Sequence, residues 1–264
     1  MRRLPLLLLL AVSGAPAAPP PLTGVVVDDR GPVAGAVVRV RATPLATRTD
    51  AAGRFTLPVG GAARVTAAAA GHLIAGADAT AGRLTFNLPR VPNDDCESYA
   101  WVDPTPDPAR PGNCGNCHAA AYREWAASGH ARAASGSHFR NLYDGTDRLG
   151  RPNRGWNLLA ELPAGAGVCA ACHAPTAEPD AAHDYDVRRV TGVAAAGVHC
   201  DFCHKVGDVA AEPGLTHGRY GLHLSRPAAG QRFFGPLDDV DRGEDVFAPV
   251  QRDSRLCAAC HEGT

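Results

Sequence analysis

Four Cys-x-x-Cys pairs, each followed directly by His, restrict what this chain can fold into more than any other feature. Because only 11 of the 264 residues are His, the chance that all four pairs meet a His in this way is a few in a million. The motifs occupy residues 114–118, 169–173, 200–204 and 257–261. They predict four sites of one kind in the second half of the chain.

This spacing is typical of covalent haem attachment. In a helix, residues i, i+3 and i+4 lie on one face, so two thiols and an imidazole point at the same porphyrin. The thiols form thioethers with the haem vinyl groups, and the imidazole binds the iron. We therefore expect four covalently attached haem c groups. The thioether residues are Cys114, Cys117, Cys169, Cys172, Cys200, Cys203, Cys257 and Cys260, and the iron ligands are His118, His173, His204 and His261.

Zinc and disulfides are the alternatives for paired cysteines. Zinc ribbons use Cys-x-x-Cys, but they do not require a His after every second Cys. An exported protein would also tend to oxidise such thiols. Haem explains all twelve residues, and it predicts that folding of this part of the chain requires the cofactor.

The second axial ligand decides what kind of haem each one is. The chain has one Met, Met1, which is expected to leave with the signal segment, so His is the expected sixth ligand. His72 lies in the N-terminal β region, where a structural role is expected. The histidines outside the motifs are His72, His130, His138, His183, His199, His217 and His223.

His130, His138 and His217 are the candidate distal ligands. The helix predicted after His118 continues towards His130, and twelve helical residues span about 18 Å. Two nitrogens on one iron lie only about 4 Å apart, so His130 should serve an iron other than that of His118. His217 is only slightly favoured over His223, His183 is a weaker candidate, and His199 is expected to be solvated.

The N-terminus predicts export. Arg2 and Arg3 precede an apolar stretch over residues 4–12 and a small-residue site ending at Ala17, as in a secretory signal peptide over residues 1–17. Nine apolar residues are too few to span a bilayer. We expect a periplasmic or extracellular protein with no membrane span in the mature chain. The net charge of −1 and the absence of a basic run argue against nucleic acid as a partner.

Residues 22–89 predict a small all-β sandwich, with period-2 runs such as 36–41 and 84–88 separated by turn residues. The segments Gly24-Val25-Val26-Val27-Asp28, Pro32-Val33-Ala34-Gly35 and Gly53-Arg54-Phe55-Thr56-Leu57 resemble the carboxypeptidase regulatory-like domain. Such domains are usually accessory modules, so we expect this unit to make no contribution to the haems.

Residues 90–112 hold five prolines and predict an extended linker. Residues 113–264 predict a mainly α, loop-rich tetrahaem domain, in which the porphyrins replace a conventional core. The chain stops three residues after His261, so we expect the domain to be C-terminally truncated. Cys96 has no partner in this scheme, and a free thiol, an intermolecular disulfide and a family-specific role all remain open.

A resemblance becomes specific around the first and third motifs. Tyr122, Trp125, Ser128, His130 and Ala131 follow the first motif, and Gly197-Val198-His199 precede the third. This pattern is similar to the cytochrome c-552/4 family of tetrahaem cytochromes, which includes the electron acceptor of hydroxylamine oxidoreductase. The resemblance implies low-spin haems with two His ligands, electron transfer, and a distal-ligand role for His130.

Electron transfer is thus the leading interpretation, with a redox partner protein or a quinol-linked donor. The alternative is a multihaem reductase or dehydrogenase of small nitrogen or sulfur compounds, which needs an iron with an open position. A third hypothesis makes the sandwich a module that docks the cytochrome to a surface or partner.

Overall fold

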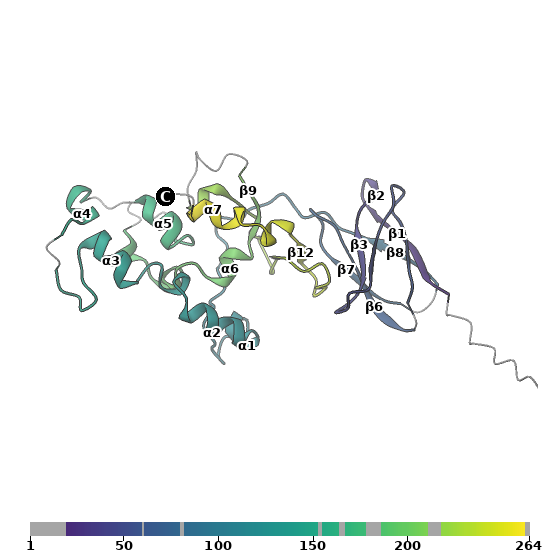
Figure 1. Cartoon of the computed structure of the whole chain (residues 1–264), viewed down its shortest axis with the longest axis horizontal. Helices are drawn as coiled ribbons and strands as arrows, with labels where there is room; N and C mark the ends of the chain where they lie inside the picture. Colours follow the sequence, from purple (N-terminus) through teal and green to yellow (C-terminus); the bar gives the residue numbers. More distant parts are fainter. Residues whose placement is uncertain are drawn as a thin grey trace, which may run out of the picture.

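The structure of the chain is a computed structural model that describes residues 20–59, 61–79, 82–152, 155–163, 167–177, 186–210 and 218–261. The predicted signal peptide, His183, His217 and the last three residues lie outside the described residues. The two four-stranded sheets lie at one end of the molecule, helices α3 to α5 lie at the other end, and α6, α7, β9 and β12 lie between them (Figure 1). No helix in the described ranges is long and apolar enough to cross a membrane.

The N-terminal part forms two four-stranded sheets, which we call the β-unit (22–89). In the first sheet, β1 lies between antiparallel β5 and parallel β8 and also pairs with β2; the second sheet has the order β4-β3-β6-β7. The strands are β1 (Leu22–Asp28), β2 (Gly31–Pro32), β3 (Val37–Val40), β4 (Ala46–Arg48), β5 (Arg54–Leu57), β6 (Ala63–Ala68), β7 (Ala75–Ala79) and β8 (Arg83–Asn87).

The two sheets share one hydrophobic core. β5 alternates exposed and buried residues, so Phe55 and Leu57 point inward, where Phe55 meets Phe86 of β8 with ring centres 6.2 Å apart. Val38 and Val65 of the second sheet join the same buried cluster. Each such side chain contributes about 1.5–3 kcal/mol on burial. The predicted two-layer β arrangement over 22–89 is therefore present.

The proline-rich segment 90–112 contains no helix or strand, as expected, but it does not run free. Asp95 binds Arg226 with Oδ1 2.7 Å from Nε, and Asp94 binds Arg232 at 2.7 Å. Tyr99 donates its hydroxyl to Asp201 at 2.9 Å. These bonds fasten the connector to the region that carries the third motif.

The remainder of the chain consists of short helices and two small sheets, and its longest described helix has nine residues. Helices of this length are marginal in water without a packed partner. The helical elements are α1 (Cys114–Cys117), α2 (Ala119–Ala127), η1 (His130–Arg132), α3 (Ser137–Asp144), α4 (Leu158–Glu161), α5 (Gly167–His173), η2 (Val187–Arg189), η3 (Gly192–Ala196), α6 (Cys200–Cys203), η5 (Gly218–Gly221), η6 (Pro249–Arg252) and α7 (Arg255–His261). The small sheets pair β9 (Val206–Val209) with β10 (Leu222–Leu224), and β11 (Phe233–Gly235) with β12 (Asp245–Phe247).

Candidate haem sites

Each of the four motifs folds as a helical turn. The motif cysteines lie on α1, α5, α6 and α7. His118 caps α1, with its backbone N–H donated to the Cys114 carbonyl at 2.9 Å, and His204 caps α6 in the same way. His173 and His261 are the last residues of α5 and α7. All four motifs therefore have the helical-turn backbone that the i, i+3, i+4 pattern predicts.

Two motif imidazoles are oriented by backbone carbonyls. Nδ1 of His204 lies 2.7 Å from the Phe234 oxygen, and Nδ1 of His173 lies 2.8 Å from the Ala133 oxygen. Because a carbonyl can only accept, Nδ1 carries a proton in both rings, which leaves Nε2 as the ring nitrogen that could bind a metal. Histidines that bind metals through Nε2 commonly have this second bond.

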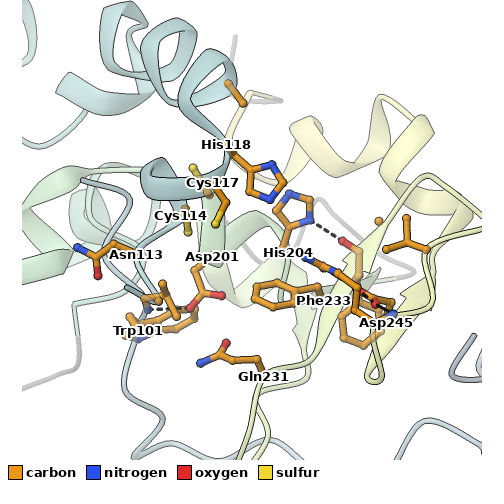
Figure 2. Close-up of a pocket in the computed structure, with 18 of the residues that line it drawn as sticks. Trp101, Asn113, Cys114, Cys117, His118, Asp201, His204, Gln231, Phe233 and Asp245 are labelled. Atoms are coloured by element: carbon orange, nitrogen blue, oxygen red, sulfur yellow. Dashed lines mark hydrogen bonds and ion pairs between the residues drawn. The ribbon is translucent and has the colours of Figure 1, made fainter. Parts of the chain in front are cut away.

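The first and third motifs open into one cavity of about 970 Å³. This shared cavity is lined by Cys114, Cys117 and His118 on one side and by Cys200 and His204 on the other. Figure 2 shows the imidazoles of His118 and His204 both turned into it. The volume lies at the upper end of the range for cofactor pockets.

The walls of the shared cavity suit a porphyrin, which is a flat apolar disc with two acidic side chains. Trp101, Tyr122 and Phe233 supply aromatic surface. The lining also carries Arg110 and Arg242, which pair with Asp107 and Asp245. The buried indole nitrogen of Trp101 has no hydrogen-bond partner among the described residues, so it could donate to a propionate. The donor set thus fits haem.

Sulfur atoms of different motifs meet in the fold. All nine cysteines are free thiols. The Cys114 thiol donates to Cys200, which lowers the pKa of Cys200 to about 7 and raises that of Cys114. Cys260 donates to Cys172 and lowers its pKa to about 7. The first motif therefore contacts the third, and the second contacts the fourth. No group of three or more His, Cys, Asp or Glu side chains in the described part is placed to hold a bare metal ion.

His130 lies opposite the fourth motif. Its ring centre is 6.1 Å from that of His261, with the planes at 51°. Two imidazoles on one iron have nitrogens about 4 Å apart, and each ring centre lies about 1 Å further back, which gives about 6 Å between centres. The predicted helix does not reach His130, because α2 ends at Ala127 and η1 follows.

The surroundings of His130 explain the residue pattern around it. Trp125 donates its indole N–H to the Val198 carbonyl at 2.8 Å, and the Val198 N–H returns to the His130 carbonyl at 3.1 Å. Gly197 has φ 71°, and a Cβ there would lie 2.4 Å from the His130 oxygen. The segment before the third motif is therefore pressed against the His130 backbone, which only glycine permits at position 197.

The other histidines fall into three groups. His72 is buried in the β-unit, where Nδ1 bonds the Ala70 carbonyl and Nε2 bonds Asp28, both at 3.0 Å, in line with the expected structural role. His138 on α3 and His223 on β10 are exposed. His138 neighbours Phe139, whose ring stacks on His173 at 3.9 Å. His183 and His217 lie outside the described residues, so the ligand roles predicted for His138 and His217 stay predictions.

His199 was expected to be solvated, and this is wrong, since only 1% of its surface is exposed. It packs edge-on against Trp101, and Nε2 lies 3.1 Å from the Thr176 hydroxyl. Burial lowers the pKa of His199 to about 4, which keeps the ring neutral. Its Nδ1 has no partner in the described part of the chain. The sequence reasoning missed the connector residues that enclose it.

A buried ion pair was also missed. Lys205, the residue after His204, binds Asp201 within the third motif, and neither side chain is exposed. Asp201 further accepts from the Tyr99 hydroxyl and the Val102 N–H, each at 2.9 Å. The signal available in the sequence was that Lys205 is the single lysine of the chain.

Comparisons with known proteins identify no family for this chain. No family model matches the chain, and no curated protein matches it. Among solved structures, a type II cohesin–X–dockerin complex from Acetivibrio cellulolyticus, an interface mutant, matches with a TM-score of 0.24 and 19% identity over 26% of this chain. The match spans 56% of that structure's chain, and a similarity this low carries no argument.

Proposed function

We propose that the chain is an exported multihaem c-type cytochrome that carries electrons through four closely spaced haems. The observation that carries the proposal is the set of four complete motifs, each of which folds as a helical turn. The contacts between motifs support the close spacing, because Cys114 touches Cys200 and Cys172 touches Cys260.

The roles of the protein residues follow from their contacts. The eight motif cysteines would hold the cofactors covalently, and His118, His173, His204 and His261 would be the proximal ligands. The carbonyls of Phe234 and Ala133 orient two of these rings. Haem supplies a reversible one-electron couple when bound. Apolar walls such as those of the shared cavity exclude water, which is one way in which a protein tunes haem potentials.

A bis-His site at the fourth motif is part of the proposal. His130 would be the sixth ligand to the iron of His261, since the separation of their ring centres is that of an axial pair. A closed iron of this kind favours electron transfer over substrate binding. His138 and His217 remain candidates for other irons.

Mass spectrometry of the protein purified from a host that attaches haem c tests the cofactor content. We expect the mass of the mature polypeptide plus four haems, and the mass of the bare polypeptide would overturn the proposal. Carbon monoxide titration of the reduced protein then separates the two functional classes. An electron carrier in which every iron has two axial protein ligands should bind no carbon monoxide. Binding of one equivalent of carbon monoxide would favour the reductase or dehydrogenase alternative.

A further inference from the structure

One stretch of chain both lines the shared cavity and contacts the β-unit. This wall segment, residues 236–247, runs from the end of β11 to the end of β12. On one side Leu237, Val240 and Val246 line the cavity. On the other side Asp238 and Asp241 contact the β-unit.

Arginines of two neighbouring strands hold the wall segment by its aspartates. Arg39 of β3 binds Asp238 with two bonds, from Nε at 2.6 Å and from Nη2 at 3.0 Å. Arg64 of β6 donates from Nε to Asp241 at 2.8 Å. The Asp241 side chain is only 2% exposed, so its charge depends on these protein partners.

Backbone contacts reinforce the ion pairs. The N–H of Ala42, in the β3–β4 turn, donates to Asp239 at 2.9 Å. Ala42 has φ 59°, a left-handed conformation that it shares with no other non-glycine residue of the described ranges, and such strain persists only where surrounding contacts hold it. The Ile74 N–H donates to the Asp245 carbonyl at 2.8 Å, and Ile74 itself lines the shared cavity.

The contact surface leaves no spare room. A Cβ built on Gly76 of β7 would lie 1.8 Å from the Asp241 carboxylate. Leu73 forms a β-bridge with Val246 and packs against the cluster that contains Phe234. Phe234 is the residue whose carbonyl orients His204. The β-unit therefore lines the cavity directly through Ile74, and it also reaches the third motif through the Leu73–Val246 bridge and the cluster around Phe234.

We propose that the β-unit positions the wall of the haem cavity, and that it thereby sets the water access and reduction potential of the haem held by His118 or His204. Arg39 and Arg64 are the positioning residues. This inference rests on the proposed function, and it departs from the expectation that the β-unit is an accessory module. If the wall loosens, water enters, and the more charged ferric state gains solvation, so the potential should fall.

Full-length variants test this inference. Arg39→Glu places a carboxylate opposite the carboxylate of Asp238. The double variant Arg39→Glu/Asp238→Arg restores the ion pair with the two charges exchanged. Arg54→Glu on β5 of the other sheet is the matched charge control. Gly76→Val pushes on Asp241 directly, and Gly61→Val, where a Cβ meets nothing within 4 Å, is the matched steric control.

Two readouts distinguish failure of this inference from failure of the proposed function. Trypsin cleavage after Arg242 in the wall segment needs no haem, and we expect it to accelerate about tenfold in Arg39→Glu and Gly76→Val. Potentiometric titration of the four-haem protein should show that the reduction potential of one haem is lower by about 59 mV. This shift corresponds to a tenfold change in the reduction equilibrium of that haem. The double variant should recover both values.

Cleavage rates and potentials equal to those of Arg54→Glu and Gly61→Val would overturn the inference while leaving the haem count untouched. A shift in Arg39→Glu that Asp238→Arg does not reverse would also count against it. A bare polypeptide mass for the wild type would overturn the proposed function, and the cleavage assay would still decide whether the β-unit holds the wall.

Discussion

Lys205 and Asp201 form an ion pair from which solvent is excluded on both sides. The ammonium also lies over the rings of Phe233, at 4.3 Å, and Tyr99, at 5.0 Å. Asp201 belongs to the third motif, and Lys205 follows its histidine. The charge pair therefore joins this attachment site to the connector, through Tyr99, and to β11, through Phe233.

Lys205→Met should destabilise the protein by about 3–5 kcal/mol, because it leaves the Asp201 carboxylate buried without a counter-charge. The double variant Asp201→Asn/Lys205→Met removes both charges and should recover most of this loss. Denaturant unfolding of the haem-loaded protein, followed by circular dichroism, measures both. A single variant as stable as the wild type would show that the pair is not buried in solution.

His130→Ala should open one iron while all four covalent attachments persist. The reason is that thioether formation depends on the cysteine pairs, whereas His130 faces His261 as a sixth ligand would. We expect one haem to become high-spin and to bind one equivalent of carbon monoxide in the reduced protein. Arg132→Ala, at an exposed position on the same turn η1, is the control and should behave as the wild type. An unchanged spectrum in His130→Ala would remove His130 from the set of ligands.

Gly197→Ala should perturb the haem that His130 is proposed to ligate, because the new side chain would displace the His130 backbone. Both Gly192 and Gly197 have positive φ, at 62° and 71°. An alanine in the left-handed helical region costs about 1–2 kcal/mol, and an alanine at Gly197, whose ψ of −133° lies outside that region, should cost more from its backbone alone. Only at Gly197 would the new Cβ strike the His130 carbonyl, at 2.4 Å, since nothing lies within 4 Å at Gly192. We expect Gly197→Ala to lose more stability than Gly192→Ala and to perturb the haem spectrum, which Gly192→Ala should leave intact. Equal behaviour of the two variants would contradict the contact.

Stability of the β-unit should decrease in acid through Asp28. The hydrogen bond from His72, together with further bonds and the Arg90 charge, lowers the pKa of Asp28 to about 2. A carboxyl with a depressed folded pKa stabilises the fold above its unfolded pKa of about 4, and this contribution is lost as the pH falls towards 2. The loss can be measured by hydrogen exchange of the β1 amides between pH 4.5 and pH 2, with exchange times adjusted so that the intrinsic exchange rates match.

Asp28→Asn should abolish the Asp28 part of this acid dependence. Asp29→Asn is the control, because Asp29 pairs with Arg90 from a side chain that is 72% exposed. If β1 exchange in Asp28→Asn depended on pH as it does in the wild type, a group other than Asp28 would be responsible for the acid dependence.

Local patterns in the sequence predicted local structure well. Each motif was expected to form a helical turn, and each does, because three of the residues involved lie within one turn. The strands around Phe55 and Phe86 follow from alternation and turn residues. In contrast, the helix after His118 was expected to reach His130, but Ser128 and Gly129 interrupt it.

Contacts between distant segments were beyond the reach of pattern reasoning. His130 and His261 lie at opposite ends of the second half of the chain, and their meeting depends on how several short helices pack. His199 was taken as solvated because nothing near it in sequence shows that Trp101 and Thr176 would cover it. The docking of the β-unit depends on Asp238 and Asp241, which lie in an irregular segment with no periodicity to interpret.

The thiol contacts between motifs bear on the order of biogenesis. In the folded chain Cys114 meets Cys200, and Cys172 meets Cys260, so each nucleophile faces a wrong partner. If the chain is exported, as proposed, an oxidant there could convert these contacts into disulfides that join two motifs and block both. A chain that folded before it was loaded would risk becoming a dead-end product. If haem is attached as proposed, attachment before the chain folds would avoid both disulfides.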